Sequence, residues 1–392
     1  MKQSIIDGIE NHRQEFYDIS IYIGENPELG HEEFKASAIL AETLKKHGFS
    51  VEMGTCGLQT AFTATYDSGK EGPTIGFMAE YDALPEVGHA CGHNLIGTMG
   101  IAAGIGLSKV ISETGGKVIV FGTPAEETKG GKVTMAEEGI FNDVDVVLMV
   151  HPLDSYMKSG TSLAMDAIQF EFFGKASHAA ASPHLGINAL DAVLQTFNSI
   201  NALRQHITSD ARIHGIITEG GKAANVVPDY AVAQFYVRAA KREYVNELVG
   251  KVKCCAEGAA LQTGATMKSS FYEFSYDDMV TNAALSDAFT KELIALGVDE
   301  NEIQTQRDGS GSLDMGNVSQ VVPAIHPYVK ITNEAYACHT YEFRDASMSE
   351  QGREAMILGA KAMALTGYEV LTNPGLLAQI KDEFKRQKTF SV

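Results

Sequence analysis

The sequence predicts an α/β protein in which a mixed sheet flanked by helices is interrupted by a smaller α+β domain. One basis is length, because 392 residues exceed the roughly 250 to 300 at which a single core stops growing. Another is the alternation of short apolar runs with helical patterns towards both ends of the chain. The third is a change of this pattern near residue 166 and its return near residue 278.

The first part of the chain predicts two helices and then a sheet. Apolar residues recur at helical spacing over Ile5–Ile23 and Glu32–His47, followed by Gly24 and Gly48, which can end helices. Four short apolar runs that follow are predicted strands: Thr60–Tyr66, Thr74–Ala79, Lys117–Gly122 and Val144–Val150. Open α/β sheets bind ligands at the carboxyl ends of strands. The polar residues found there are Glu80, Asp82, Glu126, Glu127 and His151.

Residues 166–277 are expected to form the inserted domain, and 1–165 with 278–392 the larger one. The inserted segment has the order strand, helix, strand, strand, helix, strand, a split βαβ and hence ferredoxin-like order. Its predicted elements are Ile168–Phe173, Gly186–His206, Arg212–Thr218, Tyr230–Ala239, Arg242–Gln262 and Thr266–Phe274. After it, helices and strands alternate again up to a helix at Ser349–Leu365.

Composition excludes several classes of protein. With 50 acidic and 31 basic residues, the net charge of −19 repels phosphate backbones and anionic membranes, so neither nucleic acid nor membrane is an expected partner. The first residues lack the apolar core of a signal peptide, which favours a cytoplasmic location. Five irregularly spaced cysteines indicate reduced thiols.

A Gly-punctuated turn brings Cys91 and His93 close together before an apolar helix predicted at Leu95–Ile111. A thiolate would be stabilised near such a helix N-terminus. Either residue alone is better explained as a buried cysteine or a turn histidine. Glu126 and Glu127, with a proline before them and two glycines after, form a carboxylate pair in which one can bind metal and the other accept a proton.

His151 follows a very apolar run, and alone it would be interpreted as a core histidine, although imidazole is also the commonest metal ligand. Together these thiol, imidazole and carboxylate groups predict a metal-dependent hydrolase. Gly131-Lys132 and Gly221-Lys222 lack the following Ser or Thr of a phosphate loop, and no dinucleotide fingerprint follows a strand. Nucleotide chemistry is therefore not expected.

Motifs along nearly the whole chain resemble the dinuclear-metal aminoacylase and carboxypeptidase family, in its amidohydrolase branch of aminobenzoyl-glutamate hydrolases and N-acyl-amino-acid amidohydrolases. They are AEYDALP, GHACGHN, GTPAEE, VHP, Ser177-His178-Ala179, Asn225-Val226-Val227-Pro228, Ser312-Leu313-Asp314-Met315-Gly316 and Cys338-His339-Thr340. The resemblance implies a zinc-exopeptidase-like catalytic domain with an inserted lid and dimerisation domain. It also implies hydrolysis of N-acyl amino acids, acyl-glutamates or dipeptides.

The family pattern implies a role for each matching residue. Cys91 would bridge two divalent metal ions, with His93 and His151 on one ion and Glu127 and His339 on the other. Glu126 would be the general base that deprotonates a metal-bridging water and protonates the leaving amine. Asp82 would orient a ligand imidazole.

The resemblance also implies a homodimer or higher homo-oligomer in which His178 reaches the partner's site and stabilises the oxyanion. Asn225 and Arg238 would hold the substrate's carbonyl and carboxylate, with help from Ser312. Arginine suits the carboxylate because its planar fork donates two hydrogen bonds.

Two positions depart from the wider family, since Glu80 stands where many relatives have a metal-binding histidine and Cys91 where they have aspartate. Whether Glu80 contacts metal stays open, and Asn94 replaces an aspartate common in the branch. The thiolate favours zinc, whereas the other ligands also accept manganese. The alternatives are a cysteine hydrolase with Cys91 as nucleophile and a non-catalytic metal- or peptide-binding protein.

Overall fold

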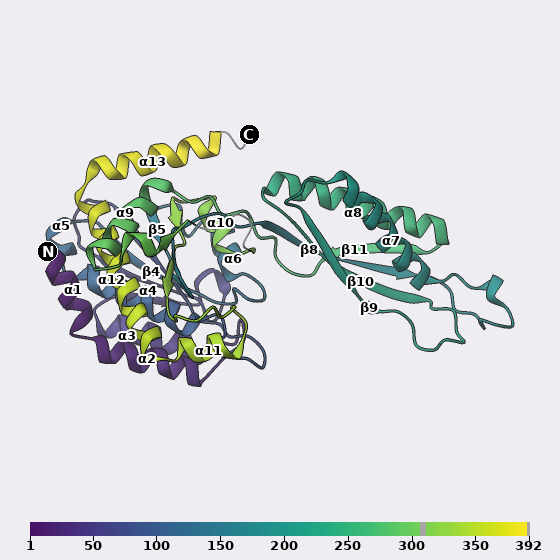
Figure 1. Cartoon of the computed structure of the whole chain (residues 1–392), viewed down its shortest axis with the longest axis horizontal. Coiled ribbons are helices and arrows are strands. Elements are labelled where there is room, and N and C mark those ends of the chain that lie inside the picture. Colours follow the sequence, from purple (N-terminus) through teal and green to yellow (C-terminus); the bar gives the residue numbers. More distant parts are fainter. Residues whose placement is uncertain (306–310, 390–392) are drawn as a thin grey trace. The chain divides into compact units, whose positions relative to one another are not determined.

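The computed structural model describes residues 1–305 and 311–389, and the chain forms two compact units (Figure 1). Unit 1 comprises Met1–Thr161 with Met279–Val392, and unit 2 comprises Ser162–Asp278. Each unit has its own cluster of buried apolar side chains. The prediction of an α/β protein with a mixed sheet and an α+β insertion is confirmed.

Unit 1 is built on a mixed sheet in the order β1-β2-β4-β3-β5-β13. The strands are β1 (Ser50–Met53), β2 (Phe62–Asp67), β3 (Thr74–Glu80), β4 (Lys117–Thr123), β5 (Val146–Leu148) and β13 (Ala324–Ile325). The strands β4, β3, β5 and β13 are parallel, whereas β2 is antiparallel to β4 and β1 to β2. The four parallel strands therefore end at one edge of the sheet.

A small second sheet in unit 1 has the order β12-β7-β14-β6. Its strands are β6 (His151–Leu153), β7 (Tyr156–Met157), β12 (Ile303–Gln304) and β14 (Tyr328–Lys330). Because β6 begins just beyond β5, this sheet fixes His151 next to the end of the parallel strands.

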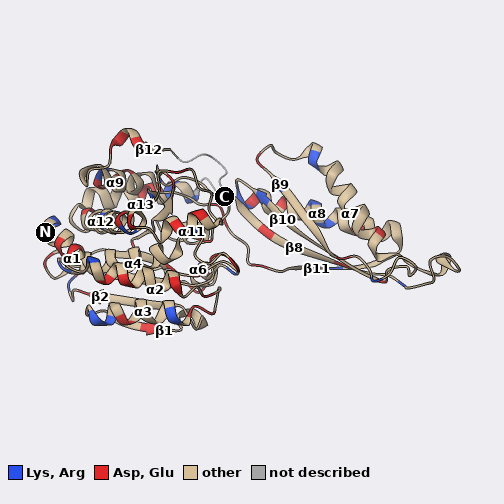
Figure 2. Ribbon diagram, turned by 60° about the horizontal axis from the view of Figure 1, so that its bottom comes forward, with Lys and Arg blue, Asp and Glu red and all other residues tan. Residues whose placement is uncertain are grey.

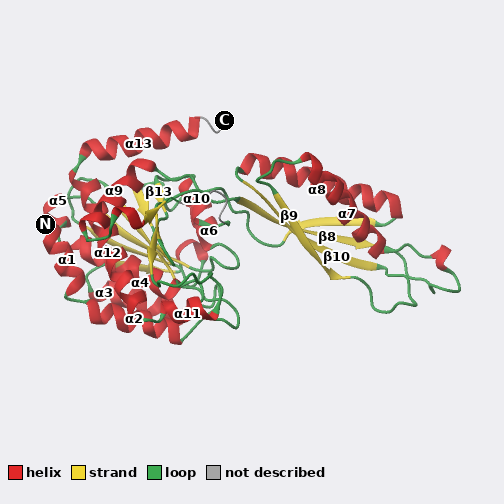
Figure 3. Ribbon diagram, in the orientation of Figure 1, coloured by secondary structure: helices red, strands yellow, loops and turns green. Residues whose placement is uncertain are grey.

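Helices surround the large sheet (Figure 3). They are α1 (Lys2–Glu10), α2 (Arg13–Glu25), α3 (Phe34–Lys46), α4 (His93–Ser108), α5 (Ile111–Thr114), α6 (Gly131–Glu137), α9 (Ala283–Ala295), α10 (Met315–Ser319), α11 (Tyr341–Ser347), α12 (Glu350–Thr372) and α13 (Pro374–Thr389). The fully buried α4 packs on β3 and β4. A Cβ at Gly100 would lie 2.3 Å from the Met78 carbonyl oxygen, and one at Gly97 would lie 2.9 Å from the Glu80 carbonyl oxygen, so these glycines permit the close approach of α4 to the end of β3.

The N-terminal helical prediction was wrong in two respects. Ile5–Ile23 is two helices, because the chain breaks at Asn11–His12; the apolar spacing continues in phase across this break and could not reveal it. Gly24 does not end a helix but lies inside α2, where its missing side chain makes room for Met348. Strand β1 was not predicted, since its mostly exposed residues carry little apolar signal.

Unit 2 has the predicted ferredoxin-like order. Its elements are β8 (Ala164–Phe173), α7 (Ala189–Leu203), β9 (Arg212–Glu219), β10 (Tyr230–Ala239), α8 (Arg242–Thr263) and β11 (Thr266–Phe271). The sheet order is β11-β8-β10-β9 with every neighbouring pair antiparallel. Helices α7 and α8 pack against each other and against this sheet. Three of the predicted substrate-contacting residues belong to this unit and lie near the two ends of β8.

Acidic and basic residues are interspersed along the helices of both units (Figure 2). Within residues 1–305 and 311–389, no helix combines the length and the apolar character needed to cross a bilayer.

Candidate active site

Residues from distant parts of unit 1 meet at the edge where the parallel strands end. Two groups of potential ligands share Cys91, and within each group the ligand atoms lie within 4.8 Å of one another. The first group is Cys91, His93 and His151, and the second is Cys91, Glu127 and His339. These are the five residues predicted as metal ligands, so the fold brings together side chains up to 248 positions apart in sequence (339 − 91).

The distances within these groups suit tetrahedral coordination. Sulfur and nitrogen ligands at about 2.3 and 2.0 Å from a zinc ion lie roughly 3.5 Å apart, and two lighter ligands lie about 3.3 Å apart. Cys91 Sγ is 3.5 Å from His151 Nε2, and His339 Nε2 is 3.1 Å from Glu127 Oε1. The donor set therefore fits two divalent cations that share the thiolate.

Asp82 orients both groups of ligands. Its Oδ1 is 3.0 Å from His93 Nδ1, which also lies 2.9 Å from the Asp82 carbonyl oxygen, and its Oδ2 accepts a hydrogen bond of 2.9 Å from Glu127 N. With Nδ1 turned to Asp82, Nε2 is the nitrogen that would bind an ion; in the protein alone burial opposes the charged imidazole, but the Glu80 and Asp82 carboxylates raise the pKa of His93 well above its usual range. Within the described residues, neither this buried Nε2 nor Glu127 Oε1 makes a hydrogen bond of good geometry, although Glu80 Oε1 lies 3.0 Å from Nε2 and His339 Nε2 lies 3.1 Å from Glu127 Oε1. Both atoms are thus left for a cation.

The expectation that the helix N-terminus lowers the pKa of Cys91 is wrong for the protein alone. A hydrogen bond with Cys338, burial and the neighbouring Glu127 raise the pKa of Cys91 well above its usual range. These effects outweigh the partial positive charge of the first turn of α4. A cation at the site would reverse this balance, because coordination deprotonates a thiol.

Glu126 has the environment of a proton acceptor that can later donate. Burial and the adjacent Glu127 carboxylate raise its pKa well above the ordinary value. One oxygen of Glu126 belongs to a third cluster with Glu80 and His93, within 4.8 Å. Burial lowers the pKa of His151 to about 4, which keeps that imidazole neutral. A base and a neutral ligand therefore lie side by side with the metal-binding groups.

The position of Glu80 has a structural explanation that sequence reasoning missed. Its Oε1 is 3.0 Å from His93 Nε2, while its Oε2 accepts a hydrogen bond from the fully buried Lys132. Lys132 Nζ also lies 2.8 Å from Asp314 Oδ1. The lysine neutralises carboxylates that would otherwise be buried beside the site. The sequence around Lys132 gave no signal of this role.

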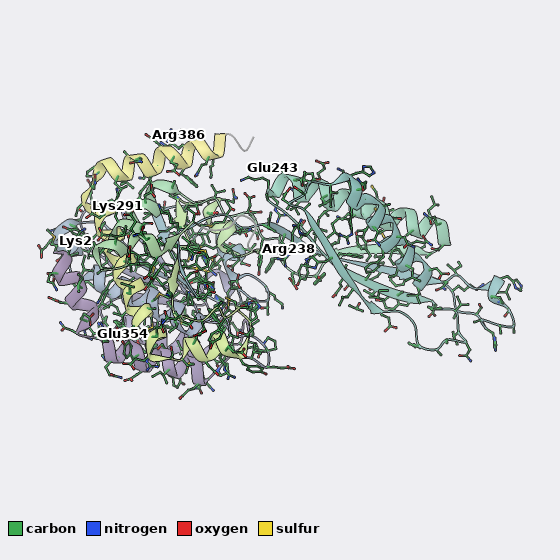
Figure 4. All side chains as sticks on the ribbon, viewed as in Figure 1. Lys2, Arg238, Glu243, Lys291, Glu354 and Arg386 are labelled. Carbon is green, nitrogen blue, oxygen red and sulfur yellow. The ribbon has the colours of Figure 1, made fainter. Side chains whose placement is uncertain are left out.

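Unit 2 carries three of the predicted substrate residues, at two separate ends of its sheet. The exposed His178 pairs with Val226 beyond the end of β8 at Phe173, and Ala179 N donates to the Asn225 carbonyl oxygen at 3.0 Å. Figure 4 labels Arg238 at the other end, where it is the register partner of Met165. The strand from Met165 to Phe173 is about 26 Å long.

A small ligand therefore cannot touch both His178 and Arg238 of one unit 2. The remaining predicted substrate residue, Ser312, is half-buried in unit 1, two residues before Asp314. Asn94, the departure in the branch motif, is buried in α4 and donates to the Ser20 carbonyl oxygen at 3.3 Å.

Glu33 is a second residue that sequence reasoning missed. It is fully buried, accepts a hydrogen bond of 2.8 Å from Ala125 N and another of 2.8 Å from the Thr60 hydroxyl, and burial raises its pKa to about 7. Ala125 has a φ of 62°, a left-handed conformation that costs a non-glycine residue energy. Glu33 therefore holds the residue that precedes Glu126.

We expect Glu33→Ala to lower kcat about 10- to 100-fold with a smaller change in KM, because a buried N–H is left unpaired and the following carboxylates shift. Glu33→Gln keeps an acceptor for Ala125 N and should recover much of the loss. Steady-state kinetics with thermal unfolding of both variants provides the check. Equal kcat in wild type and Glu33→Ala would contradict this positioning role.

Fold and site together define a metal-dependent hydrolase. Residues 165–263 match the peptidase dimerisation domain of the M20 family. The chain is 36% identical over 398 residues to a mouse (Mus musculus) Xaa-Arg dipeptidase, covering 98% of this chain and 92% of the relative. It is 31% identical over 456 residues to a p-aminobenzoyl-glutamate hydrolase polypeptide of Escherichia coli, covering 97% and 94%.

A solved dinuclear metal-binding peptidase of the M20 family from Bacillus subtilis has the same fold, with a TM-score of 0.65 at 19% identity, over 91% of this chain and 98% of that one. The chain belongs to the M20 family of metallopeptidases and amidohydrolases. It is accordingly a hydrolase of amide bonds, and this opposes the alternative of a non-catalytic binding protein.

Proposed function

We propose that this enzyme is a dinuclear metallohydrolase that cleaves the amide bond of dipeptides or N-acyl amino acids. The ligands would be Cys91 between the two ions, His93 and His151 on one, and Glu127 and His339 on the other. The single observation that supports this most strongly is that Cys91 belongs to both ligand groups. Zinc suits the thiolate, although manganese would also suit the remaining donors.

Bound divalent ions would lower the pKa of a water molecule and polarise the amide carbonyl. Glu126 would accept the proton of the attacking water and then deliver it to the leaving amine. Its raised pKa suits both transfers, because a base that is too acidic holds the proton poorly. Asp82 would keep His93 in the tautomer that leaves Nε2 free, and Glu33 would hold the segment that carries Glu126.

The proposed assembly is a homodimer in which one chain supplies Arg238 and its partner supplies His178 and Asn225. His178 would donate to the developing oxyanion, and Arg238 would pair with the substrate's carboxylate. The separation of these residues along β8 supports this arrangement, as does the match to a dimerisation domain. The expected compartment is the cytoplasm.

We favour dipeptides as the substrate class, because the relative with 36% identity is a dipeptidase. Acyl-glutamates are the second candidate on the basis of the aminobenzoyl-glutamate hydrolase relative. A screen of dipeptides ending in arginine and other residues, N-acyl amino acids and p-aminobenzoyl-glutamate, with zinc- or manganese-loaded enzyme and released amine as the readout, tests both. Turnover of none of these classes by metal-loaded enzyme would contradict the proposal.

Removing the metal should abolish activity, because the water would lose its activation. Dialysis against a chelator is expected to reduce turnover at least 1,000-fold, and zinc or manganese should restore it. This loss is within the total rate acceleration of about 10⁶-fold or more by which enzymes exceed uncatalysed reactions. The alternative, a cysteine hydrolase with Cys91 as nucleophile, predicts that chelation leaves activity intact. Activity, metal content and thiol alkylation measured on one preparation separate the two mechanisms.

A further inference from the structure

A cluster of three ligand-type side chains in unit 1 lies far from the candidate active site. It consists of His12, Glu15 and His47, whose ligand atoms lie within 4.8 Å of one another. His12 is the N-cap of α2, Glu15 lies in the first turn of that helix, and His47 is the C-cap of α3. Glu33, which contacts the active-site segment, caps the opposite end of α3. The helix between the two caps is about 21 Å long.

Two of the three ligand separations in this cluster match the edge of a coordination tetrahedron. Glu15 Oε2 is 3.3 Å from His12 Nδ1 and 3.2 Å from His47 Nε2. Nitrogen and oxygen ligands at about 2.0 to 2.1 Å from a tetrahedral zinc ion lie roughly 3.3 Å apart. The two imidazole rings meet edge to face, with centroids 4.5 Å apart. Both nitrogens therefore converge on the same carboxylate oxygen, at the separation that shared coordination requires.

The exposure of the three ligands and the nearby lysines determine how this cluster would bind a metal ion. The His47 side chain is only 6% exposed, whereas His12 is 35% exposed, so an ion would have protein on one side and an open position towards solvent. The other oxygen, Glu15 Oε1, accepts a hydrogen bond of 2.7 Å from Lys46 Nζ, which leaves Oε2 as the single ligand oxygen. Lys46 and the nearby Lys109 add positive charge, so binding should be weaker than at the active site.

We propose that His12, Glu15 and His47 form a third transition-metal site, which takes Zn²⁺ with a water as the fourth ligand and clamps the start of α2 to the end of α3. Two imidazoles and one carboxylate suit zinc, and they also accept nickel and copper. Its role would be structural, because its ligands join the N-cap of α2 to the C-cap of α3, about 21 Å along α3 from Glu33. It does not depend on the catalytic proposal.

The test compares zinc stoichiometry in the full-length holoenzyme and in His12→Gln. His12 is partly exposed and caps α2 without a side-chain hydrogen bond, so this variant should fold and hydrolyse substrate like wild type. His206→Gln, which removes an exposed histidine of unit 2, is the matched control. After equilibration in zinc buffered by a chelator, wild type and the control should each bind one zinc ion per chain more than His12→Gln.

A second readout is zinc-dependent stability. At free zinc 100 times the dissociation constant of this third site, the site should lower the unfolding equilibrium constant of wild type about 100-fold more than zinc lowers that of His12→Gln or Glu15→Gln, which keep the active-site ions. Equal zinc content in all the proteins, or an equal zinc effect on unfolding in wild type and in both variants, would overturn the proposal. Retained activity in the variants separates site loss from misfolding.

Discussion

Glu126→Gln is expected to keep both active-site metals and to lose turnover by about 10²- to 10⁴-fold, the usual contribution of a positioned general base. Glutamine has nearly the same shape but cannot accept a proton from water. The buried position of Glu126 between Glu127 and Glu80 means that removing one negative charge there should not destabilise the fold. The measurement is kcat together with metal content per chain.

Glu127→Gln is the matched comparison, because the two residues are adjacent but have different contacts. Glu127 Oε1 lies 3.1 Å from His339 Nε2 and its backbone N–H donates to Asp82, so its replacement should lower metal content. A Glu126→Gln enzyme that loses its metals, or that keeps full turnover, would reject the assignment of Glu126 as the base.

His178→Ala is expected to lower kcat about 100- to 1,000-fold, the effect of removing one oxyanion donor, with metal content unchanged. His178 is exposed and lies at the end of unit 2 away from Arg238, so the substitution should not affect folding. Kinetics and metal analysis on the same preparation provide the check.

Mixing His178→Ala with Glu126→Gln tests whether His178 acts on the partner chain. After subunit exchange, a heterodimer has one site that combines the intact Glu126 of one chain with the intact His178 of the other. Recovery of up to half the wild-type activity per heterodimer is expected. Heterodimers demonstrated by mass measurement but without recovered turnover would mean that His178 acts within its own chain or not at all.

Sequence reasoning anticipated the site better than its surroundings. Four of the predicted ligands share a local signal, since Cys91, His93, Glu127 and His151 each follow a strand or lie in a glycine-punctuated turn, whereas His339 was implied only by the family resemblance. Glu33 and Lys132 gave no comparable signal, because their importance arises only from long-range contacts with Ala125 and with Glu80 and Asp314. Similarly, the apolar periodicity gives no sign of the break at Asn11–His12.

The pKa of Cys91 could not be predicted from the sequence for the same reason, because it depends on groups distant along the chain. Proximity to a helix N-terminus was readable from the glycine-punctuated turn, whereas the hydrogen bond with Cys338 and the nearby carboxylates depended on segments distant in sequence. The assignments of His178, Asn225, Arg238 and Ser312 stay predictions, and the experiments above are their test.

The length of strand β8 has a genetic consequence. With His178 and Arg238 separated by about 26 Å of sheet, a shared site makes each catalytic centre the joint product of two polypeptides. Two inactive alleles, one altered at His178 and the other at Arg238, would then complement each other in a cell that expresses both. Diluting the wild-type enzyme until it dissociates into single chains would also abolish its activity.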